Sequence, residues 1–197
     1  GVLLQRHAQA LRDAGLSRVN VSLDTISPET FALITGMDCW QEVVDGLLEA
    51  KAVGLSPVKL NTVLMKGVND DEIPSLVDFA IAHELELRFI EWMPTNPLVD
   101  VEREDRFLSN DVAKARIEER YLLTPDDTDP HSPARNFRIE GTQTRVGFIN
   151  PLSNVFCAMC NRVRLKVTGC IKTCLHGREE LDLKAMLRER LPREAIK

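Results

Sequence analysis

The stretch that decides the fold is residues 58–64, which read VKLNTVL and predict a buried β-strand. Two further stretches of the same kind flank it, VNVSLD at residues 19–24 and LRFIEWM at residues 87–93. Helical patterns separate the three strands, so residues 1–95 alternate helix and strand. This alternation is typical of parallel strands joined by right-handed crossovers. The sequence therefore predicts an α/β fold, with too few strands to close a barrel but enough for one arc of it.

Several side chains lie at or near the carboxyl ends of these strands, where α/β barrels place their chemistry. They are Ser22, Asp24, Asn61, Thr62, Glu91 and Met93. We expect a functional site at this edge of the sheet.

The pattern changes after Pro97, where a charged segment with little periodicity begins. Ser109 predicts the start of another helix because serine is a favoured N-cap. The remaining predicted elements are an antiparallel pair at residues 137–139 and 144–149, a hairpin at residues 163–167 and 170–174 turned at Thr168-Gly169, and a helix at residues 181–191. We therefore expect two regions, residues 1–97 and residues 98–197.

Four cysteines lie within eighteen residues near the end of the chain, at positions 157, 160, 170 and 174. Thiols at this density hold a metal or form disulfides. Residues 1–15 lack the apolar run of a signal peptide, which favours a reducing compartment and a metal. Spacing alone slightly favours zinc, with an iron–sulfur cluster as the second reading and two unrelated structural features as the third.

Arg162 and Arg164 follow the first cysteine pair directly. If this segment is a strand, both point to the side of Cys160, because strand residues alternate between faces. Two guanidinium groups there suit a phosphate or a nucleobase, whereas a structural zinc site needs neither. Surface ion pairs are the alternative for each arginine alone.

The composition limits the partners. The 197 residues are 44% hydrophobic and 28% charged, with a net charge of −5, which is typical of a soluble globular protein. An acidic balance argues against a nucleic-acid-binding role, and no apolar run approaches the roughly 18 residues of a membrane span. We expect a cytoplasmic protein with no nucleic-acid or membrane partner, and the sequence leaves a homodimer open.

Four segments together resemble one family, the GTP 3′,8-cyclases, which are radical S-adenosylmethionine (SAM) enzymes of molybdenum cofactor biosynthesis. The segments are residues 20–24, 59–63, 89–94 and the C-x2-C-N-R-x-R…C run at residues 157–174. The C-x2-C-x13-C spacing with its Asn-Arg-x-Arg run is highly specific. SPAR at residues 132–135 and VGFI at residues 146–149 are also similar to family segments, so the resemblance covers essentially the whole chain.

The resemblance implies a partial radical SAM TIM-like barrel at residues 1–97, formed by its last three βα units, followed by a C-terminal α+β region at residues 98–197 that carries an iron–sulfur cluster. The implied site residues are Ser22 and Met93 for SAM, Lys59, Arg162, Val163 and Arg164 for GTP, and Cys157, Cys160 and Cys174 for the C-terminal [4Fe-4S] cluster. Cys170 has no ligand role in the family pattern.

The implied activity is that of a lyase, the radical SAM conversion of GTP to 3′,8-cyclo-7,8-dihydro-GTP. The family cleaves SAM at a second [4Fe-4S] cluster, held by a C-x3-C-x2-C motif that this sequence lacks. Gly1 resembles the end of a Thr-Thr-Asn-Gly segment of the family, so we expect a fragment that is inactive alone. The alternatives are an auxiliary-cluster radical SAM enzyme acting on a peptide and a zinc-binding structural module.

Overall fold

The computed structural model describes residues 1–93, 106–126, 132–155, 157, 160, 162–174, 177, 179–190, 192 and 194. Its elements, in chain order, are α1 (Leu4–Asp13), β1 (Val19–Ser22), α2 (Pro28–Thr35), α3 (Trp40–Ala52), β2 (Val58–Leu64), the 3-10 helix η1 (Asp70–Glu72), α4 (Ile73–Ala82), β3 (Glu86–Glu91), α5 (Asn110–Glu118), β4 (Leu123–Pro125), β5 (Ala134–Ile139), β6 (Arg145–Ile149), β7 (Arg164–Leu165), β8 (Cys170–Lys172), β9 (Glu180–Asp182) and α6 (Leu183–Arg188).

A six-stranded sheet carries most of these elements, and its strand order is β1-β2-β3-β6-β5-β4. β1, β2, β3 and β6 run parallel, whereas β5 and β4 continue the sheet in antiparallel fashion. The predicted α/β class and the predicted pairing of β5 with β6 are confirmed. β6 comes from beyond residue 98 yet pairs with β3, so both predicted regions contribute to one sheet. The expected boundary between residues 97 and 98 lies outside the described residues.

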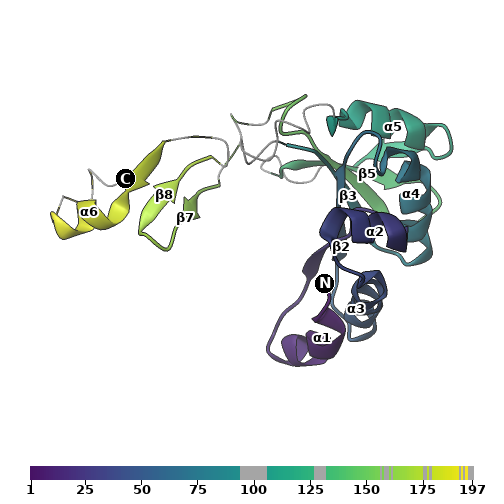
Figure 1. Ribbon diagram of the computed structural model, residues 1–197, viewed down its shortest axis with the longest axis horizontal. Coiled ribbons are helices and arrows are strands. Elements are labelled where there is room, and N and C mark those ends of the chain that lie inside the picture. Colours follow the sequence, from purple (N-terminus) through teal and green to yellow (C-terminus); the bar gives the residue numbers. More distant parts are fainter. Residues whose placement is uncertain are drawn as a thin grey trace.

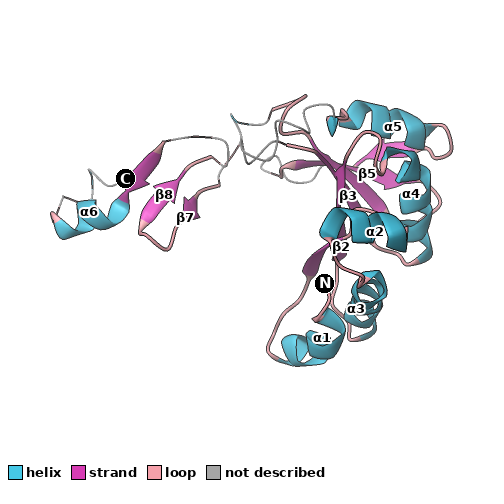
Figure 2. Ribbon diagram, viewed as in Figure 1, coloured by secondary structure: helices cyan, strands magenta, loops and turns pink. Residues whose placement is uncertain are grey.

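Side-chain alternation gives the parallel part of the sheet one covered face and one polar face. Along β2 and β3, every second residue is buried and the residues between are half-exposed. The helices supply the cover: α3 packs on β2, and α4 and α5 pack on β3. Figure 2 shows these helices, in cyan, gathered on one side of the magenta strands.

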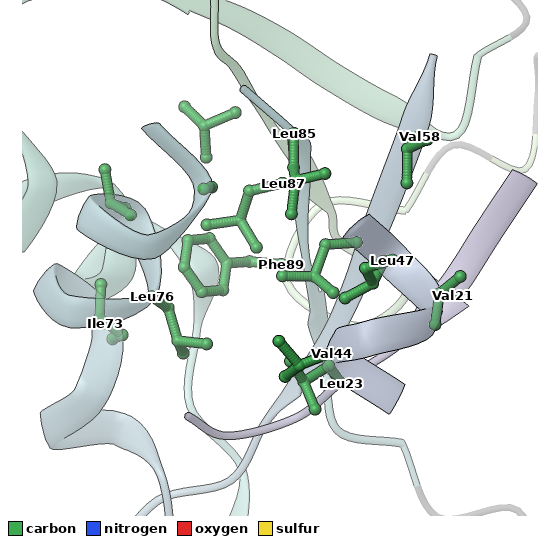
Figure 3. Close-up of a cluster of buried hydrophobic side chains, with 14 of the residues drawn as sticks. Val21, Leu23, Val44, Leu47, Val58, Ile73, Leu76, Leu85, Leu87 and Phe89 are labelled. Carbon is green, nitrogen blue, oxygen red and sulfur yellow. The ribbon is translucent and has the colours of Figure 1, made fainter. Parts of the chain in front are cut away.

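The core lies between the covered face and the helices (Figure 3). Leu47 of α3, Leu76 of α4 and Phe89 of β3 are fully buried there. Phe89 also stacks against Phe148 of β6, with ring centroids 6.1 Å apart. Burying one such side chain stabilises the fold by about 1.5–3 kcal/mol. The core therefore fixes the strands whose other face is polar.

Serine caps fix the starts of two helices, and the start predicted at Ser109 is confirmed. Ser27 Oγ accepts a hydrogen bond from Thr30 N at 3.1 Å before α2. Ser109 Oγ accepts one from Asp111 N at 3.2 Å before α5. Such a cap stabilises a helix by about 1 kcal/mol. Within the described ranges, no helix is both long enough and apolar enough to cross a membrane.

A small antiparallel sheet of β7, β8 and β9 precedes α6. The predicted hairpin at Thr168-Gly169 is confirmed, since β7 and β8 pair on either side of it. The predicted last helix begins later than expected, at Leu183, because Leu181 pairs with β8 and Asp182 Oδ1 caps the helix. Figure 1 shows this small sheet and α6 at the far end of the long axis from helices α1–α5.

Candidate functional site

The polar face of the six-stranded sheet is the candidate site. Two rows of side chains cross its parallel strands in register. They are Asn20, Lys59 and Glu86 in the first row and Ser22, Asn61 and Arg88 in the second, nearer the carboxyl ends. Asn61 Oδ1 and Arg88 Nε are buried without a hydrogen-bond partner. Such atoms are costly to leave unsatisfied, so this face offers polar groups to a ligand.

The first row continues across the sheet as a chain of ion pairs. Lys59 Nζ lies 2.8 Å from Glu86 Oε2, and Arg145 Nη1 lies 3.5 Å from Glu86 Oε1. Arg145 Nε is 2.6 Å from Asp126 Oδ2, which Arg138 Nη2 also approaches at 3.3 Å. Three cations share two carboxylates, so the row carries a positive excess. Lys59, the predicted GTP contact, points to this polar face and not to the helices. It lies in the first row, nearer the amino ends of the strands than Ser22.

Arg88 is the cation whose surroundings most favour an anion. Burial is the main cause that lowers the pKa of Arg88, the Glu86 carboxylate raises it, and the charge of Arg162 lowers it again. A bound anion stabilises a guanidinium that is withdrawn from water and feels a second positive charge. Arg88 was not among the residues predicted from the sequence. Strand alternation could have identified Arg88, because a residue between buried Leu87 and Phe89 points to the opposite, polar face.

Gly147 of β6 lies in register with Arg88, between β3 and β5. A Cβ at this position would lie 2.8 Å from Asn136 Oδ1 and 3.3 Å from Ala134 Cβ, whereas 3.5 Å from Arg88 Cγ is an ordinary contact. The glycine therefore makes room for Asn136 and Ala134 of β5, which lie beside Arg88 on the sheet.

The two predicted SAM contacts lie at the carboxyl edge of the sheet. Ser22 is the exposed last residue of β1, and Met93 is half-buried two residues beyond the end of β3. Asp24 follows β1 at the same edge, and its Oδ1 accepts a hydrogen bond from Val63 N at 2.7 Å. Burial raises the pKa of Asp24, and the hydrogen bond from Val63 opposes this in part.

The cysteines lie in two places. Cys157 and Cys160 are exposed free thiols in one turn, where Cys160 N donates to Cys157 O at 3.2 Å. Cys174 is exposed two residues beyond β8, and Cys170 is half-buried within β8. In the part of the chain that the structure describes, no three His, Cys, Asp or Glu side chains gather as a metal site.

The convergence of Cys157, Cys160 and Cys174 on one cluster stays a prediction. The pair lies between β6 and β7, and Cys174 follows β8. The chemistry of the donors suits an iron–sulfur cluster, because such clusters are held by cysteine thiolates.

The predicted GTP residues after the cysteine pair are exposed. The positive charge of Arg162 is one of the causes that lower the pKa of Arg88 on the polar face. Arg164 opens β7 and pairs in register with Lys172, and Val163 lies between the two arginines. The strand begins only at Arg164, so strand alternation does not place Arg162 and Arg164 on one side.

Comparisons with known proteins match nearly the whole chain. Residues 1–80 match the family model of the radical SAM superfamily, and residues 85–197 match that of Molybdenum Cofactor Synthesis C.

Among curated proteins, the chain is similar to several with the name GTP 3′,8-cyclase. The one from Alkaliphilus metalliredigens is 42% identical over 189 residues, which are 96% of this chain and 58% of the relative. The one from Streptomyces coelicolor is 42% identical over 198 residues, 100% of this chain and 58% of the relative. GTP 3′,8-cyclase 1 of Pseudomonas aeruginosa is 48% identical over 189 residues, which are 95% of this chain and 57% of the relative. The chain thus spans less than two thirds of the length of these relatives.

Proposed function

Because the chain belongs to the Molybdenum Cofactor Synthesis C family and carries a radical SAM region before that part, we propose that it is the GTP- and cluster-binding portion of a GTP 3′,8-cyclase. The reaction is the lyase conversion of GTP to 3′,8-cyclo-7,8-dihydro-GTP in molybdenum cofactor biosynthesis. Identities of 42–48% to proteins of that name over nearly the whole chain support the transfer.

The architecture is that of one arc of the radical SAM barrel. The parallel order of β1, β2 and β3, with helices on one face and polar side chains on the other, supports residues 1–97 as its last three βα units. Residues 98–197 are the substrate and cluster region, and β6 lies beside the arc at β3. The polar face then lines the interior, where such barrels carry out their chemistry near the carboxyl ends of the strands.

The observation that carries the nucleotide assignment is the buried Nε of Arg88, which has no hydrogen-bond partner. A bound anion would satisfy this donor and offset the repulsion between the charges of Arg88 and Arg162. The triphosphate of GTP is that anion. Lys59 adds to the positive field from the first row, although it shares its charge with Glu86. Arg164 and Val163 complete the guanine side of the site.

Two cofactor sites flank this nucleotide. Ser22 and Met93 would hold SAM, and Cys157, Cys160 and Cys174 would hold a [4Fe-4S] cluster through their thiolates. When bound, these groups supply the one-electron chemistry of the family. The chain's own residues bind and orient GTP, because much of the rate of a ring closure comes from holding the reacting atoms at near-attack distance.

A calorimetric titration with GTP after anaerobic reconstitution tests this function. We expect binding without turnover, since the sequence lacks the C-x3-C-x2-C motif. Changing Arg162 and Arg164 together to Ala should weaken binding by about 1.5–3 kcal/mol for each charge-assisted bond that is lost. The matched control changes two exposed arginines of the same region, Arg188 and Arg190, and should not alter the affinity. Unchanged binding in the Arg162/Arg164 variant removes both residues from the site.

A further inference from the structure

Glu91 is a carboxylate buried on the apolar side of the sheet. It is the last residue of β3, its surface is 1% exposed, and it shares the covered face with Leu87 and Phe89. The sequence analysis expected Glu91 at the functional edge, but its side chain turns toward the covered face. A carboxylate in such a place is stable only where hydrogen-bond donors replace its water.

Four donors converge on this carboxylate, and three of them belong to the segment directly after β6. Oε2 accepts from Leu152 N at 3.1 Å and from Ser153 N at 3.0 Å. Oε1 accepts from the Ser153 hydroxyl and from Asn110 N at 3.2 Å. Two consecutive backbone N–H groups on one oxygen form an anion-binding nest, and here that nest fixes the path of the chain at Leu152 and Ser153.

Asn110, the first residue of α5, binds the same region at the ends of β3 and β6. Its Nδ2 donates to Phe89 O at 3.3 Å, to Ile149 O at 3.0 Å and to Asn150 Oδ1 at 2.8 Å. The ends of β3 and β6 and the start of α5 are thereby tied together. The segment that leaves β6 is consequently held to β3 as far as Ser153.

The cysteine pair comes next along the chain. Cys157 is four residues beyond Ser153, so its Cα lies within about 14 Å of the Ser153 Cα, at roughly 3.3–3.6 Å per residue. Beyond the pair, the charge of Arg162 acts on Arg88, which belongs to β3 as Glu91 does. The contact that ties this segment to β3 is therefore the one that Glu91 makes at Leu152 and Ser153.

We propose that Glu91 is a positioning residue that holds the cysteine-bearing segment so that Cys157 and Cys160 face the nucleotide site around Arg88. This inference rests on the proposed function, in which the cluster and GTP bind at the same site. Glu91 touches neither of them and acts through the backbone and hydroxyl of Ser153.

The test compares Glu91→Gln with Glu72→Gln in the anaerobically reconstituted protein. Glu72 is the matched control: its carboxylate also anchors a loop, accepting from the Thr25 hydroxyl at 2.6 Å and from Ile26 N at 2.9 Å, away from the cysteine segment. Thermal unfolding, iron and sulfide content, GTP affinity and the electron paramagnetic resonance spectrum of the reduced cluster are measured with and without GTP.

Both variants should unfold at a lower temperature and keep their iron and sulfide. Glu91→Gln alone should raise the Kd for GTP by roughly 10–100-fold, the usual effect of losing a group that orients metal ligands. It should also abolish the change that GTP causes in the resonance spectrum. Glu72→Gln should match the wild type in both measurements.

A folded Glu91→Gln protein with the wild-type Kd and spectral response overturns the inference, and so does an equal loss in Glu72→Gln. If Glu91→Gln does not fold, Ser153→Ala removes one donor and must show a smaller loss of affinity in the same direction, or the inference fails. A wild-type protein that does not bind GTP overturns the proposed function and this inference together. The wild-type titration therefore distinguishes the two failures.

Discussion

Single side chains on the polar face decide whether it binds an anion, and Arg88 is the one to change first. Arg88→Ala should weaken GTP binding by about 1.5–3 kcal/mol, because it removes charge-assisted donors from a desolvated place. Arg120→Ala is the control, since Arg120 is an exposed partner of Asp78 at 3.7 Å and lies outside the polar face. Isothermal titration with GTP measures both. Equal affinities in the two variants would show that Arg88 takes no part in binding.

Asp24 allows a test by pH. Burial raises the pKa of Asp24 above its ordinary value of 3.8, so the folded protein holds this proton more tightly than the unfolded chain does. The stabilisation from this proton is complete below pH 3.8 and is lost as the pH rises through the folded pKa. Asp24→Asn keeps an acceptor for Val63 N but has no charge to bury.

Asp24→Asn should therefore gain stability relative to the wild type as the pH rises through that window. Chemical denaturation at a series of pH values measures the difference between the two proteins. A difference that stays constant with pH would contradict a raised pKa at Asp24.

The sequence could place some site residues but not others. Ser22 and Met93 follow from the carboxyl ends of their strands, and both are at that edge in the structure. Arg88 was missed because one arginine in a strand has no sequence context until its neighbours are known. Glu91 was expected at the edge because strand ends are polar in general, and only the four donors show why it turns inward.

Strand β6 shapes the site through the glycine in its middle. Gly147→Ala would place a Cβ 2.8 Å from Asn136 Oδ1, so the Asn136 side chain must shift on the face that carries Arg88. We expect a loss of about 1–3 kcal/mol in the free energy of unfolding, as for other overpacked positions, together with weaker GTP binding where the shifted side chain disturbs Arg88.

The control for this change is Gly141→Ala in the turn between β5 and β6. Gly141 has φ +76°, which strains an alanine, but a Cβ there meets nothing within 4 Å. Both variants should lose stability, and only Gly147→Ala should lose affinity. Denaturant unfolding and GTP titration of the same samples separate the two effects. Normal affinity for GTP in Gly147→Ala would show that this position of β6 does not affect the site.

The elements themselves were largely predictable because their patterns are local. Strand periodicity predicted β1, β2 and β3, and Ser109 predicted the start of α5. The parallel pairing of β3 with β6 was not predictable, because it joins residues about 60 positions apart in the chain, such as Leu87 and Val146, and no local pattern specifies such a neighbour.

For the molecule as a whole, the cysteine motif and the arginines beside it identified the family from the sequence, and the family models bear this out. The spatial arrangement of Cys174 relative to Cys157 could not be read from spacing. Cys157 lies in the connection between the two sheets and Cys174 follows β8, and spacing along a chain does not determine how such segments meet.

The central claim is that the C-terminal cysteines hold a three-thiolate cluster beside a nucleotide site, and analysis of iron and acid-labile sulfide per chain tests it most directly. After anaerobic reconstitution we predict about four of each per chain. Cys174→Ala should lose most of both, whereas Cys170→Ala should keep both, because Cys170 is not among the three proposed ligands. A single zinc per chain that is lost equally from both variants would contradict the claim and indicate a four-thiolate structural zinc site instead.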